Sequence, residues 1–132
     1  MQGVIEDIVQ KAKNNQFFRQ VLETGERVQV VIMSIPAGGE IGSEVHSDND
    51  QILFLVEGDG TVVLNGEEKP FRKGDLVLVK AGTEHNFITA GNDPMKIITT
   101  YSPPHHPQGT VHKTKEEADQ AHYSVLPQIA FF

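Results

Sequence analysis

The segment EVHSDNDQILFLVEGDG, residues 44–60, joins an acid and a histidine to an apolar run that ends at a glycine turn. Alternate residues of a β-strand project to the same side, so we expect Glu44 and His46 to face the interior into which Leu53 and Leu55 pack. An unpaired carboxylate in a protein interior costs several kcal/mol. The segment therefore predicts a sheet whose interior contains a partner for Glu44.

Short β-rich runs separated by turn residues surround this segment. They are FFRQVLE (17–23), RVQVVIMSI (27–35), QILFLVE (51–57), TVVL (61–64), EKPF (68–71), DLVLV (75–79), HNFIT (85–89) and MKIITTY (95–101). Asn65-Gly66 between two of the runs is a strong signal for a two-residue hairpin. Short strands at this spacing predict an all-β fold, an antiparallel sandwich or barrel.

The two ends of the chain differ from this pattern. Apolar residues at helical spacing predict a short amphipathic helix at about residues 3–13. Residues 102–132 begin with prolines and continue into the helix-favouring KEEADQAH (115–122), which predicts an arm and a short helix folded over the barrel. We expect a single domain over residues 1–132, with its barrel at about 17–101.

Composition excludes several classes of function. The chain has 132 residues, no cysteine and a formal net charge of −7. Disulfides and thiolate chemistry are therefore excluded, and nucleic acids and anionic membranes are poor partners. No apolar run approaches the roughly 20 residues of a membrane span, and the N-terminus lacks the features of a signal peptide, so we expect a cytoplasmic protein.

Two segments have a fixed spacing of distinctive residues. Residues 38–58 read G-x5-E-x-H-x4-Q-x6-G, and residues 74–89 read G-x5-K-x-G-x2-H-x3-T. They resemble the two signature motifs of the cupin superfamily, which usually read G-x5-H-x-H-x3,4-E-x6-G and G-x5-P-x-G-x2-H-x3-N. The resemblance covers roughly residues 28–101 and implies a double-stranded β-helix, the jelly-roll barrel of cupins, with short terminal helices.

The resemblance also implies a metal site inside the barrel. Glu44 replaces the first cupin histidine and Gln51 replaces the cupin glutamate, so two histidines and one carboxylate remain with their positions exchanged. We expect Glu44, His46 and His85 to hold one divalent transition metal per chain, for which Fe, Mn, Ni, Co, Cu and Zn are all candidates. Gln51 is either a fourth ligand or a hydrogen-bond partner that orients His46 or a bound water.

Several histidines and cationic residues occur outside the motifs. His105, His106 and His112 occur in the proline-rich arm, where exposed loop histidines are the ordinary interpretation. We predict that His112 contacts a substrate, because GTVHKT (109–114) ends the irregular arm just before the terminal helix. Arg19 and Lys96 are interpreted as solvated charges on strand faces.

Related cupins include metal-dependent dioxygenases and sugar-phosphate isomerases. The two motifs contain no tyrosine or additional glutamate for proton transfer in isomerisation, and only Lys80 could bind a phosphate. This absence favours a dioxygenase-like oxidoreductase that acts on a small molecule over a sugar-phosphate isomerase. A non-catalytic module that binds a metal or small ligand is the alternative from a different class.

A homodimer is the expected assembly. The stretch VQVVIMSI, residues 28–35, is apolar on both strand faces. Antiparallel strands usually alternate between apolar and polar residues because one face of the sheet meets water. The outer face of this strand is apolar as well, so another element must cover it. A second subunit or the N-terminal helix could supply this cover.

Overall fold

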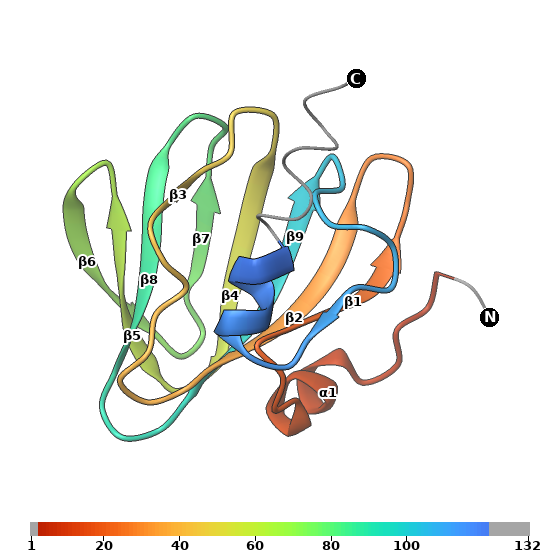
Figure 1. Ribbon diagram of the computed structural model, residues 1–132. Helices are drawn as coiled ribbons and strands as arrows, with labels where there is room; N and C mark the ends of the chain where they lie inside the picture. Colours follow the sequence, from red (N-terminus) through yellow and green to blue (C-terminus); the bar gives the residue numbers. More distant parts are fainter. Residues whose placement is uncertain (1–2, 122–132) are drawn as a thin grey trace.

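Two antiparallel β-sheets enclose the apolar core of the computed structural model, which describes residues 3–121. One sheet has the strand order β10-β1-β2-β9-β4-β7 and the other has the order β3-β8-β5-β6 (Figure 1). This arrangement confirms the predicted all-β jelly-roll barrel. In chain order the elements are α1 (Ile8–Asn14), β1 (Arg19–Thr24), β2 (Gln29–Ile35), β3 (Glu44–Val45), β4 (Asp50–Glu57), β5 (Asp59–Leu64), β6 (Glu67–Arg72), β7 (Leu76–Val79), β8 (Glu84–Ala90), β9 (Met95–Ser102) and β10 (Val111–His112), with a further helix at 115–121.

The core follows from the period-two pattern of the strands. Along β4, Gln51, Leu53 and Leu55 are buried, whereas Ile52 between them is exposed. Leu53 and Leu55 belong to a cluster that also contains aromatic and aliphatic residues of the opposite sheet. Burying each leucine stabilises the fold by about 1.5–3 kcal/mol. The same alternation that buries these leucines also directs Gln51 to the interior.

Helix α1 covers the outer face of the six-stranded sheet, at the lower right of Figure 1. Ala12 of the helix is fully buried in a second cluster with Ile32 of β2 and Val56 of β4. The helix therefore supplies the cover that the two-sided apolar strand requires, and the homodimer stays a prediction. The helix begins at Ile8 rather than near residue 3, because the left-handed conformation of Asp7 (φ 49°) interrupts the backbone before it.

Residues 103–112 return across the barrel and end in β10, which pairs with β1. The side chain of Gln29 binds the backbone of this arm at three points. Its Oε1 accepts hydrogen bonds from the amides of His105 (3.1 Å) and His106 (3.0 Å), and its Nε2 donates to the His106 carbonyl (2.7 Å). Gln29 is fully buried, so its amide has no competing water. The arm is thus fixed over one end of the barrel.

Ala118, in the helix at 115–121, belongs to the main core cluster. Within residues 3–121 no helix is long and apolar enough to cross a membrane.

Candidate metal centre

Glu44, His46 and His85 converge between β3 and β8. One ligand atom from each lies within 4.8 Å of the other two. The Nε2 of His46 is 3.9 Å from the Oε1 of Glu44. His46 and His85 are buried, and Glu44 is partly buried. The structure therefore brings together the three side chains that the motifs single out, in a cluster that could bind a metal ion.

Local backbone contacts between the two motifs produce this convergence. Antiparallel pairing of β3 with β8 makes Glu44 and His85 direct partners. On the same side, the amide of Gly82 donates a hydrogen bond to the carbonyl of His46 (2.8 Å). Gly82 has φ 85°, a left-handed conformation that favours glycine. The turn of the second motif therefore holds the backbone of the first motif beside it.

The orientation of His85 leaves one of its nitrogens available to a metal. Its Nδ1 lies 2.8 Å from the carbonyl oxygen of Thr83. A carbonyl only accepts hydrogen bonds, so Nδ1 carries the proton and Nε2 keeps its lone pair. A backbone carbonyl behind a histidine is a common way to orient a metal ligand. Two imidazoles and a carboxylate suit a divalent transition metal, so the residues present fit the predicted ion.

Gln51 points into the barrel interior and is almost completely buried. Its Nε2 donates a hydrogen bond to the Oγ1 of Thr99 (3.1 Å). Its Oε1 is buried and has no hydrogen-bond partner among the described residues. Burial of an amide oxygen without a hydrogen-bond partner destabilises the fold unless a metal, a water or a ligand binds that oxygen. The two roles considered for Gln51, direct ligand and orienting partner, are both compatible with this environment.

The histidines of the arm line up beside the cluster. The ring of His105 lies 4.4 Å from that of His46 and stacks at 5.4 Å on the buried ring of Tyr101, measured between centroids. His106 lies 4.8 Å from His105, and its ring is 6.5 Å from that of His112. His105 is exposed, as expected of a loop histidine. The same interpretation is wrong for His106 and His112, which are partly buried because the arm is held at the barrel end by Gln29 and by the pairing of β10 with β1.

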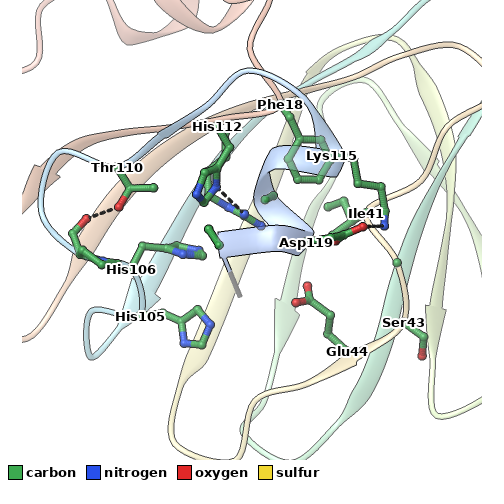
Figure 2. Close-up of a pocket in the computed structure, with 15 residues that line it drawn as sticks. Phe18, Ile41, Ser43, Glu44, His105, His106, Thr110, His112, Lys115 and Asp119 are labelled. Carbon is green, nitrogen blue, oxygen red and sulfur yellow. Dashed lines mark hydrogen bonds and ion pairs between the residues drawn. The ribbon is translucent and has the colours of Figure 1, made fainter. Parts of the chain in front are cut away.

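A cavity of about 480 Å³ lies between the barrel and the arm. Glu44 contributes to its wall from the barrel, and His105, His106 and His112 contribute from the arm (Figure 2). In the close-up, Lys115 and Asp119 of the terminal helix form an ion pair on another side of the cavity. The space is within the size range of small-ligand sites. His112 thus has the position expected for a substrate contact, and its role remains a prediction.

Arg19 and Lys96 differ from their interpretation as solvated charges. Arg19 is only 6% exposed and lines the cavity. Its Nη1 lies 3.2 Å from the Nδ1 of His112. Lys96 is half-buried, and its Nζ donates to the Oγ of Ser34 (3.0 Å). Arg19 shares the inward face of β1 with Val21, so strand alternation in FFRQVLE was the signal that could have identified it.

Two groups near the cavity are held neutral by their surroundings. Burial raises the pKa of Tyr101 to about 12, although the positive charge of Arg19 acts in the opposite direction. Burial also lowers the pKa of His106 to about 2, and the neighbouring Arg19 and His105 lower it further. At neutral pH both side chains therefore offer hydrogen-bonding groups without charge.

Comparison with known proteins gives three informative relatives. The uncharacterized Bacillus subtilis protein YrkC is 41% identical over 119 residues, which cover 85% of this chain and 63% of YrkC. The chain therefore spans less than two thirds of the length of YrkC. The crystal structure of BH2720 from Bacillus halodurans is 38% identical, with a TM-score of 0.88 over 90% of this chain and 95% of that one. A Thermotoga maritima protein named as oxalate-binding is 26% identical over 66 residues, 50% of this chain and 54% of that protein.

The family model described as "Cupin domain" matches residues 31–101. This match contains both motifs, and the jelly-roll fold brings their acid and histidines together in the barrel. The chain therefore belongs to the cupin family.

Proposed function

We propose that this cupin is a metal-dependent small-molecule enzyme, a dioxygenase-like oxidoreductase that uses one divalent transition metal per chain. The observation that carries the proposal is the convergence of Glu44, His46 and His85 beside a cavity of about 480 Å³. Two imidazoles and one carboxylate form the donor set of non-haem iron oxygenases, which leaves positions open on the metal.

Each residue of the proposed site has a separate task. Glu44 and the Nε2 of His85 would hold the ion together with His46, and Thr83 keeps the imidazole of His85 in the required tautomer. The bound metal would supply redox chemistry with oxygen beside a chelating enol or phenol. His112 would contact the substrate from the arm, with its Nδ1 held by Arg19.

The test is oxygen consumption by the iron(II)-loaded protein with a panel of small enolisable and phenolic compounds. We expect uptake that depends on protein and substrate, and its loss in His85→Ala and Glu44→Ala variants that remain folded. Glu68→Ala is the matched control, because Glu68 is an exposed acid on the edge strand β6, away from the cavity. Absence of uptake with every loaded metal and compound would refute the oxidoreductase proposal.

A sugar-phosphate isomerase remains a second candidate because of two residues outside the motifs. Tyr101 has its ring 6.0 Å from that of His46, and Arg19 lines the cavity. Tyr101 could transfer a proton during isomerisation, and Arg19 could bind a phosphate. The motifs themselves lack such a tyrosine and offer only Lys80 for the phosphate, which is why they favour oxygen chemistry. Isomerisation of aldose and ketose phosphates without oxygen uptake would identify this activity.

A non-catalytic binding module is the third candidate, and the name of the Thermotoga maritima relative supports it. This function predicts that a small ligand raises the melting temperature of the metal-loaded protein, whereas no substrate is consumed.

A homodimer, a cytoplasmic location and the lack of nucleic-acid and membrane partners remain part of the proposal.

A further inference from the structure

Arg19 is a buried cation without a carboxylate partner among the described residues. Only 6% of the residue is exposed. The ion pairs of residues 3–121 join His46 with Glu44 and Lys115 with Asp119, and neither includes Arg19. The Nε of Arg19 is also buried without a hydrogen-bond partner in this part of the chain. A buried guanidinium without a counter-charge costs several kcal/mol, so a ligand that supplied one would be bound strongly.

The groups in contact with Arg19 do not cancel its charge. Its Nη1 donates to the Nδ1 of His112, which must therefore be an unprotonated acceptor. Neither Tyr101 nor His106 can supply a negative charge at physiological pH, because a phenol ionises only at about pH 10 and an imidazole is neutral or positive. The wall of the cavity next to Arg19 is thus positive.

The rest of the cavity adds no compensating negative charge once a metal is bound. Lys115 and Asp119 neutralise each other across 2.9 Å. Glu44 would reduce the charge of a divalent ion to about +1. With Arg19, the cavity would carry about two positive charges, and such a space concentrates small anions.

We propose that Arg19 is the anion-binding residue of this cavity and that its ligand is a small organic carboxylate. One carboxylate group pairs with the guanidinium of Arg19, and a second oxygen donor of the same molecule faces the cluster of Glu44, His46 and His85. This inference names the substrate class of the proposed enzyme and rests on that function for the second contact. The pairing with Arg19 itself needs no metal.

The chemistry of the wall favours a carboxylate over a phosphate. The guanidinium is hydrogen-bonded to His112 and also interacts with Tyr101, so a ligand pairs with its remaining N–H groups, and a planar carboxylate with two oxygens suits such a pairing. Phe18, Ile41 and Ala118 supply apolar surface for the carbon skeleton of the ligand. A tetrahedral phosphate would bring a further terminal oxygen that the described wall does not pair, because Lys115, its other cation, is held by Asp119.

The first experiment is calorimetric titration of the full-length protein, in the presence of zinc(II), with sodium benzoate, sodium malonate and sodium acetate. Benzamide serves as the neutral analogue of benzoate, and inorganic phosphate serves as the competing anion. We expect saturable binding of at least one carboxylate and none of benzamide. Arg19→Gln should weaken the binding at least about tenfold, and Arg19→Lys should weaken it less, because the charge remains and the planar fork is lost.

Arg72→Gln is the matched control, since it removes the same charge from an exposed position on β6. It should bind the carboxylate as the wild type does. If Arg19→Gln does not fold, the wild type and Arg19→Lys still decide the question. Absence of saturable carboxylate binding to the wild type, or equal affinity in the wild type and Arg19→Lys, would overturn the proposal. Tighter binding of phosphate than of every carboxylate would overturn the assigned ligand class.

Elemental analysis of the same variants separates this inference from the proposed function. We expect Arg19→Gln to retain the metal, whereas Glu44→Ala should lose the metal and still bind the carboxylate at Arg19. A protein that binds carboxylate through Arg19 and shows no oxygen uptake would refute the oxidoreductase alone. A protein that consumes oxygen and binds no carboxylate would refute only the role of Arg19.

Discussion

Glu44 and His85 are direct Cα partners in the ladder between β3 and β8, although they are 41 positions apart in the chain (85 − 44). This pairing joins the acid of the first motif to the histidine of the second. The hydrogen bond from the amide of Gly82 to the carbonyl of His46 positions the third candidate ligand, His46, beside them. The candidate ligands are therefore positioned by backbone pairing, and their side chains need little further ordering to bind a metal.

Metal content is the most direct prediction from this geometry. The purified protein should contain close to one transition metal ion per chain, measured by elemental analysis. His85→Ala and His46→Ala should each lose most of the metal and keep the β-sheet circular dichroism spectrum. His112→Ala is the matched control, because its Nδ1 contacts Arg19 rather than the cluster, and it should retain the metal. Full occupancy in both ligand variants would contradict the assignment.

A second prediction concerns Gln51→Glu, which restores the carboxylate usual in cupins. The new side chain would place a charge in the buried environment beside Thr99. We expect the metal-free variant to lose about 1–3 kcal/mol of unfolding free energy, and added metal to restore most of it. The rate of oxygen uptake should change more than the metal affinity. Thr99→Val provides a control, since it removes the hydrogen bond without adding charge.

Strand alternation and motif spacing were sufficient to predict the fold and the inward direction of the ligands. Both depend on local rules, namely the period of two along a strand and the need for glycine at Gly82. The same alternation places Arg19 on one strand face with Val21, but an arginine on a strand face is interpreted from sequence as a solvated charge. Strand periodicity could have indicated the inward direction of Arg19, but not the cavity that it lines.

The position of the arm could not be predicted for a different reason. Its proline-rich sequence has no periodicity, and its course depends on Gln29, which lies more than 70 residues earlier in the chain. Contacts of this kind are set by tertiary structure and leave no local pattern. The prediction for His112 came from its place before the terminal helix, whereas His105 and His106 had no comparable signal.

The role of Gln29 leads to a third prediction. Gln29→Leu removes the partners of two backbone amides and one carbonyl of the arm. We expect a loss of about 2–4 kcal/mol in unfolding free energy and faster amide hydrogen exchange in residues 103–110. Gln10→Leu is the control, because the side chain of Gln10 is exposed and its one hydrogen bond is to Asn14 in the same helix. Unchanged exchange in the arm would show that Gln29 does not fix it.

The predicted homodimer has a testable surface in the structure. Ile52 (38% exposed), Leu76 (59%) and Leu78 (49%) form an apolar patch on β4 and β7, and β7 ends the six-stranded sheet. We expect sedimentation at about twice the chain mass, and monomers when Leu76 and Leu78 are both replaced by lysine. Val9→Lys, a comparable change on α1, should leave the dimer intact. A monomeric wild type at micromolar concentration would exclude the assembly.

The last prediction is a dependence of stability on pH through His106. Burial lowers its pKa from the ordinary value of 6.5 to about 2 in the folded chain. Below pH 6.5 the unfolded chain therefore binds a proton that the folded chain does not, and the free energy of unfolding falls with decreasing pH, by up to about 1.4 kcal/mol per pH unit. Arg19, His105 and His112 surround the ring and oppose its protonation.

In urea titrations of the metal-free protein between pH 5 and pH 7, His106→Asn should reduce the slope of unfolding free energy against pH relative to the wild type. His112→Asn should reduce it less, because His112 is more exposed and its pKa is lowered to a smaller extent. An equal slope in the wild type and His106→Asn would contradict the buried, neutral state of this histidine.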